Sequence, residues 1–158
     1  MRRILFRGIP KREMDFDFYR RAFPFPGNTY DGSFALGSLL VDEDNGRAYI
    51  CGSAIIAMNC TVGNAQCSAI EVEPVTVGQF IGLLDKNGRK IFEGDIVMKR
   101  TYHGKKPCKV VFSFGCFHCG FGGGSSTATH PYFLDDSQIE VIGNIHDNPE
   151  MLEVMQNG

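Results

Sequence analysis

Residues 75–97 read VTVGQFIGLLDKNGRKIFEGDIV, and this stretch decides the fold class of the chain. The apolar run at 77–83 favours an extended strand, and a turn follows it at 85–88. Asn87-Gly88 within that turn favours a hairpin in which both residues have positive φ. The corner at 93–95 leads into a strand at 96–98, and we expect Asp95 to accept hydrogen bonds from nearby backbone amides. The stretch therefore predicts short strands joined by tight turns.

Working outward, the same alternation predicts further strands in both directions along the chain. They lie at 3–7, 38–41, 47–50, 70–73, 109–114, 132–134 and 138–145. Asn45-Gly46 predicts a hairpin between the second and third of these strands, and Asn148-Pro149-Glu150 predicts the start of a short terminal helix. Residues 11–21 fit either a short helix or a charged loop, 23–28 and 120–126 fit loops, and 53–66 have no clear pattern.

The composition is that of a globular protein, with 43% hydrophobic and 22% charged residues among 158. No run approaches the ~20 apolar residues of a membrane span, and the N-terminal apolar run is too short for a signal peptide. We therefore expect a cytoplasmic protein without membrane contact. In that compartment the six cysteines are expected to be core residues or free thiols, and no disulfide framework is expected.

Cys116 and Cys119 have the Cys-x-x-Cys spacing of a zinc half-site. Cys108 and His130 are the other candidate ligands, but their spacings match no standard zinc module. A thiol–disulfide motif would need a helix N-terminus, which this glycine-rich region does not predict. We therefore interpret the segment as a loop with incidental thiols and expect no bound metal or other cofactor.

Charge is unevenly distributed although the net charge is only −2. From 99 to 109 there are five basic residues and no acid, and after 109 no lysine or arginine occurs. The candidate nucleic-acid contacts are Lys99, Arg100, Lys105, Lys106 and Lys109, together with the arginines near the N-terminus. A solvated basic hairpin tip is the interpretation that we favour, because nucleic-acid domains are usually basic overall.

No catalytic constellation is evident in the sequence. The four histidines are scattered, and no serine or cysteine lies in a nucleophile elbow. Glu93 and Asp95 would be a carboxylate pair for acid–base or metal chemistry, but no histidine or third carboxylate lies beside them. The glycine-rich 120–126 lacks the lysine of a phosphate-binding loop. We therefore expect a protein that is not an enzyme.

The stretch at 75–97 resembles the core motif of the YopX family of phage and prophage proteins. Three further segments resemble that family's pattern: RRILFRG at 2–8, GSLLV at 37–41 and EVIGNIHDNPE at 140–150. The chain departs from the pattern in the long proline-rich 11–34 and in the cysteine-rich 108–119. The resemblance covers roughly half of the chain and implies a phage or prophage context, but no particular reaction.

The resemblance also implies a mostly β fold with minor α structure. We expect an N-terminal β portion with variable insertions at 1–74, packed on a small SH3-like β-barrel with a short terminal helix at 75–158. The favoured function is a non-enzymatic module that binds an unidentified protein partner or copies of itself. Its 13 phenylalanines and segregated charge favour a homo-oligomer. A nucleic-acid-binding accessory protein and an unrecognised metalloprotein are the alternatives.

Overall fold

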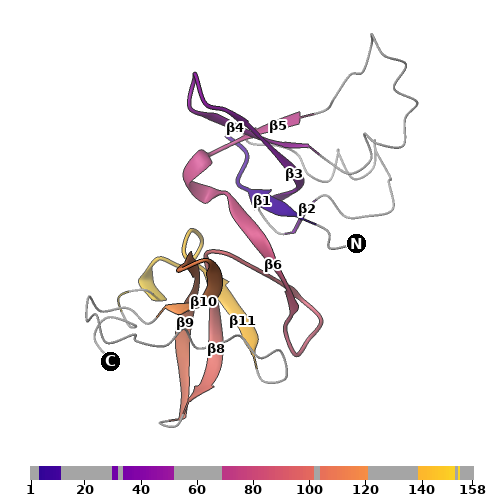
Figure 1. Cartoon of the computed structure of the whole chain (residues 1–158). Coiled ribbons are helices and arrows are strands. Elements are labelled where there is room, and N and C mark those ends of the chain that lie inside the picture. The colour runs from indigo at the N-terminus through magenta and orange to yellow at the C-terminus, as the bar shows by residue number, and fades with distance from the viewer. Residues whose placement is uncertain are drawn as a thin grey trace. The chain divides into compact units, whose positions relative to one another are not determined.

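The chain is mostly β and divides into two compact units. The structure, a computed structural model, describes residues 4–11, 30–31, 34–51, 69–101, 104–120, 139–151 and 153 (Figure 1). The N-terminal unit covers Arg3–Gln79, and the C-terminal unit covers Phe80–Gly158 together with Met1–Arg2. The expected boundary at 74 stays a prediction. The expectations for 12–29, 53–66, 121–126 and 132–134 lie outside the described residues.

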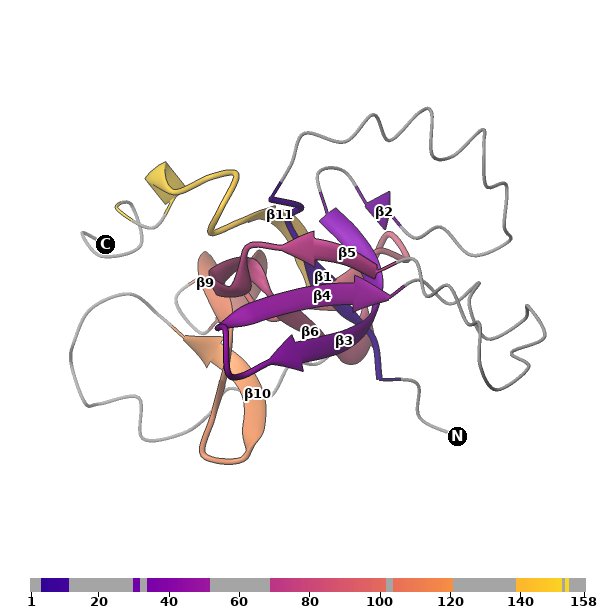
Figure 2. The same ribbon diagram turned by 90° about the horizontal axis from the view of Figure 1, so that it is seen from above.

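In the described part of the N-terminal unit there are five antiparallel strands, and Figure 2 shows three of them, β3, β4 and β5, as neighbours. The strands are β1 (Phe6–Gly8), β2 (Tyr30–Asp31), β3 (Phe34–Asp42), β4 (Arg47–Cys51) and β5 (Ala69–Val72). Their order is β5-β4-β3-β1, with β2 also on β3. The core is built from small and branched side chains: Ala35, Ala48, Ile50 and Val72.

This sheet curls until β5 meets the segment that follows β1. Pro10 forms a bridge with Val72, and backbone hydrogen bonds on either side of it join Lys11 to Glu71 and Glu73 to Ile9. Gly8 permits the approach, since a Cβ there would lie 2.8 Å from a methyl carbon of Val72. The sequence analysis expected strands here, but it did not anticipate this curvature.

The hairpin between β3 and β4 confirms the prediction from Asn45-Gly46. Asp42 pairs with Arg47, and the Asp42 carboxylate accepts hydrogen bonds from the backbone N–H and the side-chain amide of Asn45. Gly46 has φ +62°, a conformation that favours glycine.

The C-terminal unit is built on a four-stranded antiparallel sheet in the order β10-β9-β8-β11. These strands are β8 (Asp95–Thr101), β9 (Gly104–Ser113), β10 (Cys116–Gly120) and β11 (Glu140–Asn144). Two more strands, β6 (Gly78–Leu84) and β7 (Lys90–Phe92), precede them; β6 begins in the N-terminal unit beside β1 and ends in the C-terminal unit beside β7. The core comprises Ile81, Ile91, Ile96, Val97, Cys108, Val110, Cys119, Ile139 and Val141.

The turn between β6 and β7 corrects the prediction made for Asn87-Gly88. Gly88 has φ +79°, but Phe114 is the one described non-glycine residue with positive φ, so Asn87 does not share the conformation. The Gly88 N–H donates to the Asp85 carbonyl oxygen, and the Asp85 N–H donates to the Arg89 carbonyl oxygen. A three-residue loop with a left-handed residue at its end replaces the expected two-residue turn.

The corner before β8 has the predicted form. Gly94 has φ +83°, and the buried Asp95 carboxylate accepts a hydrogen bond of 2.8 Å from the Phe92 N–H. After β11 the backbone is helical at Glu150, Met151 and Glu153. The short terminal helix as a whole stays a prediction. The SH3-like form of the C-terminal unit stays a prediction. In the described part of the chain no helix has the length and apolar character of a membrane span.

Candidate functional site

The Cys-x-x-Cys segment lies on a strand, not in the loop that we expected. Cys116 and Cys119 are the first and fourth residues of β10, so their side chains leave opposite faces of the sheet. Cys119 is buried opposite Val110, and the thiol of Cys116 lies near the Ser113 carbonyl. In a turn, Cys-x-x-Cys spacing lets both sulfurs bind one metal ion. On a strand, the same spacing places the two sulfurs on opposite faces of the sheet.

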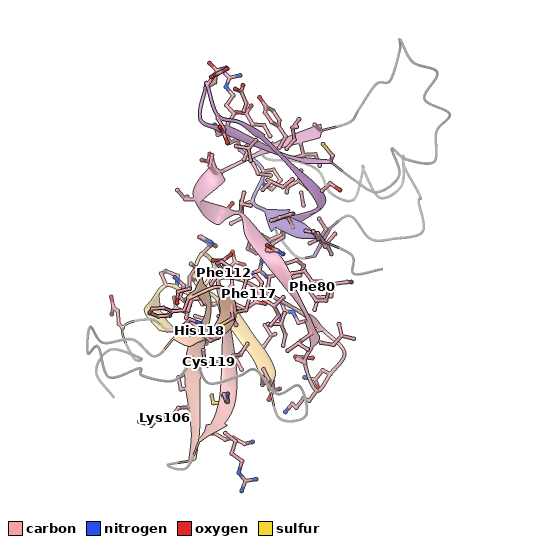
Figure 3. All side chains as sticks on the ribbon, in the orientation of Figure 1. Phe80, Lys106, Phe112, Phe117, His118 and Cys119 are labelled. Carbon is pink, nitrogen blue, oxygen red and sulfur yellow. A yellow bond between two sulfur atoms is a disulfide. The ribbon has the colours of Figure 1, made fainter. Side chains whose placement is uncertain are left out.

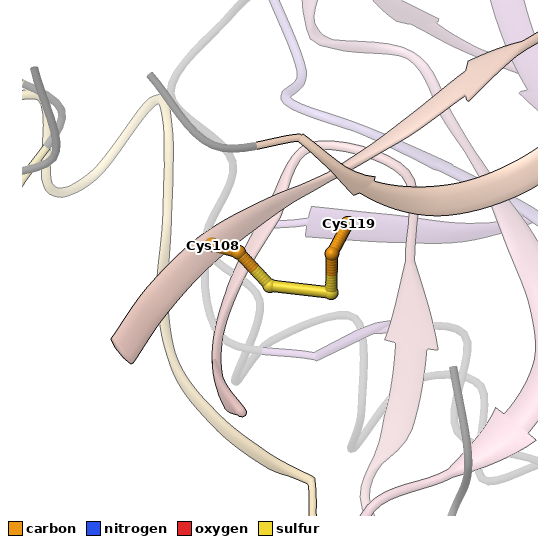
Figure 4. The surroundings of a disulfide bond; sticks show 2 residues. All are labelled: Cys108 and Cys119. Atoms are coloured by element: carbon orange, nitrogen blue, oxygen red, sulfur yellow. A yellow bond between two sulfur atoms is a disulfide. The ribbon is translucent and has the colours of Figure 1, made fainter. Parts of the chain in front are cut away.

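Cys119 instead lies against Cys108 of β9 (Figure 4). Cys108 lies two positions before Val110, the partner of Cys119, so both side chains point from the same face into the core. Their Cα atoms are 5.5 Å apart, and the structure joins the sulfurs as a disulfide. We expected free thiols at these two positions. The sequence did not predict the contact, because a separation of eleven residues does not by itself show that a hairpin brings Cys108 and Cys119 together.

No metal site assembles within the residues that the structure describes. Nowhere among them do three His, Cys, Asp or Glu side chains come close enough to hold one ion. His130, the fourth candidate ligand, lies outside the described residues.

The candidate nucleic-acid residues gather at the end of the hairpin between β8 and β9. We call residues 99–101 and 104–106 the basic ribbon. In its register Lys99 lies opposite Lys106, and Arg100 lies opposite Lys105. The pairing of β11 with β8 reaches Met98, and that of β10 with β9 reaches Lys109. Within the described sheet the ribbon is therefore two strands wide and extends past its neighbours, as Figure 1 shows.

The two cross-strand pairs of the ribbon face opposite ways, because successive residues of a strand alternate between faces. Lys99 and Lys106 share one face, and Arg100 and Lys105 share the other. Glu140, on β11, is an acid near Lys105. A hydrogen bond from Lys86 lowers the pKa of Glu140, and Lys105 adds a weaker attraction in the same direction. That carboxylate is thus largely neutralised by Lys86 rather than by the ribbon.

The other predicted contacts are less favourable for binding a nucleic acid. Lys109 is half-buried, as Lys99 of the ribbon is, and lies opposite Ile96. Arg7 is 2% exposed, and its guanidinium lies 4.3 Å from the centre of the Phe34 ring. The N-terminal arginines were expected to contribute to a basic surface, but Arg7 is used inside the fold.

A third feature, absent from the sequence analysis, lies at the opposite end of β9. Ser113 pairs with Cys116, so Phe114 and Gly115 form a two-residue hairpin loop with φ +52° and +77°. Such loops normally carry asparagine, aspartate or glycine, since bulky side chains are strained at positive φ. The sequence pattern predicts a strand that ends at Phe114, and the signal for the turn is the glycine directly after this residue.

Aromatic side chains surround this loop, and we call Phe112, Phe114 and Phe117 the aromatic turn. Phe114 is 92% exposed and Phe112 is 53% exposed. The Phe112 and Phe117 rings pair across the strands with their centres 4.9 Å apart. Figure 3 shows Phe112, Phe117 and His118 close together, away from Lys106 at the ribbon.

His118 braces this hairpin. Its Nε2 lies 3.2 Å from the Ser113 hydroxyl and its Nδ1 lies 3.4 Å from the Cys116 carbonyl oxygen. If Nδ1 carries the proton, it donates to the carbonyl and Nε2 accepts from the hydroxyl. Both ring nitrogens are thus hydrogen-bonded to residues of the same hairpin, Ser113 before the loop and Cys116 after it. This arrangement fixes the loop that carries Phe114.

Comparison with known proteins gives structural relatives, of which one is described here, and a protein family. The crystal structure of protein EF1440 from Enterococcus faecalis is 25% identical in sequence, and the match covers 73% of this chain and 85% of that one with a TM-score of 0.43. No curated protein matches the chain. The profile of the family described as "YopX protein" matches residues 42–153. Because that range covers well over half of the sequence, the chain belongs to the YopX protein family.

Proposed function

We propose that this chain is a non-enzymatic protein-interaction module of a phage or prophage, and that it associates with a second copy of itself. Membership of the YopX family supports the phage context. The observation that carries the interaction is the exposed aromatic turn, with Phe114 at its tip.

Phe114 contributes little to the fold that presents it. Its side chain is almost fully exposed and gains no free energy of burial, while its positive φ costs stability of the order of 1–3 kcal/mol. Phe112, which precedes it by two residues, also exposes half of its surface. Aromatic side chains often supply most of the binding energy of a protein interface. Burial of Phe114 against a partner would therefore offset the stability that its positive φ costs.

The neighbouring strand favours a second copy as the partner. β10 directly follows the aromatic turn and is the terminal strand of its sheet among the described residues. An edge strand pairs readily with another strand, and two antiparallel copies of β10 related by a two-fold axis would present the same surface to each other. The aromatic turns would then add apolar contact to backbone hydrogen bonds.

Light scattering coupled to size-exclusion chromatography tests this proposal. We expect the wild-type mass to rise above 17.5 kDa as the concentration increases. Phe114→Asn combined with Phe112→Thr should shift the protein toward the monomer without unfolding it, because asparagine tolerates positive φ and threonine suits a strand. Val75→Asn is the matched control, since Val75 is 83% exposed in the other unit. A monomer at every concentration would contradict the proposal.

A further inference from the structure

We propose that Cys116 and His118 of two copies of this chain together bind one zinc ion between their paired β10 strands. This inference rests on the proposed self-association and names a ligand that strengthens it. Three observations carry it. They are the face on which the two side chains lie, the hydrogen bonds of the imidazole, and the registers that two antiparallel β10 strands allow.

The two candidate ligands lie on one face of the hairpin. Cys116 and His118 are two positions apart on β10, so both leave the sheet from the face opposite to Cys119. Their donor atoms converge on Ser113. The Cys116 sulfur lies 3.7 Å from the Ser113 carbonyl oxygen, and His118 Nε2 lies 3.2 Å from the Ser113 hydroxyl. Cys116 is a free thiol. Because structural zinc sites are built from thiolates and imidazoles, this face offers half of a Cys2His2 set.

The hydrogen bonds of His118 suit a zinc ligand. Its Nδ1 lies 3.4 Å from the Cys116 carbonyl oxygen, and a proton on Nδ1 leaves the lone pair of Nε2 facing Ser113. Zinc-bound histidines almost always donate their other ring N–H to a carbonyl or a carboxylate, which fixes the tautomer and the orientation of the ring. His118 already has this arrangement, so its ring would exchange only the Ser113 hydroxyl for the metal.

One chain does not complete the set of ligands. A structural zinc site has four of them. Among the described residues of one chain, no three His, Cys, Asp or Glu side chains come close enough to hold an ion together. A second copy can supply the other two, because β10 is the terminal strand of its sheet in the described part of the chain. The proposed site is therefore incomplete without the partner copy.

The backbone of β10 limits how two copies can pair. The residues that flank a two-residue loop form a hydrogen-bonded pair, and Ser113 and Cys116 hold these positions. Alternate residues from Cys116 onward thus direct their N–H and C=O groups toward β9, while Phe117 directs its own toward the outer edge of the described sheet.

A two-fold axis at Phe117 satisfies this alternation. Phe117 and its copy then form a hydrogen-bonded pair, which brings together residues of the two aromatic turns. The same register places Cys116 of each chain directly opposite His118 of the other. These are non-hydrogen-bonded pairs, in which the Cα atoms are about 4.5 Å apart and the side chains lie close together. Two thiolates and two imidazoles therefore surround the axis on one face.

Titration of Zn²⁺ into the metal-free full chain, with its free thiols kept reduced, tests the proposal by light scattering. Because only paired chains carry four ligands, zinc at about a hundred times its dissociation constant should strengthen association about a hundredfold. Binding should saturate at one ion for two chains. Cys116→Ser and His118→Gln should each remove the response. Cys51→Ser is the matched control, since Cys51 is the other free thiol in the described part of the chain.

Three results would overturn the site. Association that zinc leaves unchanged would exclude a shared metal ion while leaving the contact between copies in place. A zinc response that persists in Cys116→Ser, or Co²⁺ bound without thiolate charge-transfer absorption, would place the metal elsewhere. A chain that stays monomeric with and without zinc would contradict the proposed self-association as well. Circular dichroism of each variant separates loss of zinc binding from loss of fold.

Discussion

At the residue scale, Asp85 ties together parts of the C-terminal unit that are distant in sequence. One carboxylate oxygen accepts hydrogen bonds from the backbone N–H groups of Asn87 and Arg89, and the other accepts one from Val141 of β11. Burial raises the pKa of Asp85, but the hydrogen bonds from Arg89, Val141 and Asn87 outweigh it, so the pKa lies below its ordinary value.

Asp85→Asn should therefore destabilise the protein by about 1–3 kcal/mol at pH 7, because an amide N–H₂ would face a backbone donor. The folded pKa of Asp85 is below the unfolded one, so its contribution is complete above about pH 4 and is lost as the pH falls through the folded value. In urea unfolding, the difference in free energy of unfolding between wild type and variant should become smaller as the pH falls. Asp44→Asn, at an exposed loop position, is the control, and a difference that is constant with pH would refute this role.

Gly37 is the second residue on which the fold depends. β3 pairs with β1 up to Gly37 and with β4 from Ser38 onward, so the strand changes partner at this point. A Cβ on Gly37 would overlap the carbonyl oxygen of Cys51, a backbone atom with little freedom to move. We expect Gly37→Ala to cost about 3 kcal/mol or more in thermal or urea unfolding. Ser38→Ala, at the exposed neighbouring position, should change stability little; equal effects would contradict the assigned contact.

At the scale of the element, the basic ribbon predicts a gain in stability when two of its charges are removed. Removing one cation from each side of the Arg100–Lys105 pair relieves cross-strand repulsion. Arg100→Gln combined with Lys105→Gln should therefore raise the free energy of unfolding by about 0.2–1 kcal/mol. The gain should shrink at high salt, where the repulsion is screened. A loss of stability at low salt would show that the pair contributes favourably to the fold.

Elements with strong local signals could be predicted from the sequence. These signals depend only on neighbouring residues. They are the alternation at 70–73 and 96–98, the Asn45-Gly46 hairpin and the Asn148-Pro149 helix start. β10 could not be predicted, because Cys116-Phe117-His118-Cys119 resembles a metal motif more than it resembles a strand. The conformation of Asn87 was also wrong, since loop length as well as residue type selects the turn.

Features that depend on distant residues were not predicted. The bridge between Pro10 and Val72 joins positions 62 residues apart, and its hydrogen bonds curl the N-terminal sheet. The contact of Cys108 with Cys119 requires the hairpin at Phe114, whose local signal is the single glycine Gly115. That glycine alone does not show that residues 108 and 119 meet. Among the site residues, the sequence identified the basic ribbon but not the aromatic turn, because exposure of a phenylalanine is a property of the folded chain.

At the scale of the whole molecule, the basic ribbon and the aromatic turn are separated along a single strand. The basic ribbon occupies the first residues of β9, and the aromatic turn follows its last residue. A strand of ten residues is about 33 Å long, so contact between copies at the aromatic turn would lie far from the charges of the ribbon.

Amide hydrogen exchange followed at several protein concentrations tests the central claim, that the aromatic turn and β10 form the contact between copies. We expect protection at Cys116–Gly120 and around Phe114 to increase with concentration, because these amides become buried between two chains. Protection in the basic ribbon should not change, and Phe114→Asn combined with Phe112→Thr should abolish the increase. Protection that is independent of concentration, or that increases elsewhere and not at β10, would contradict the claim.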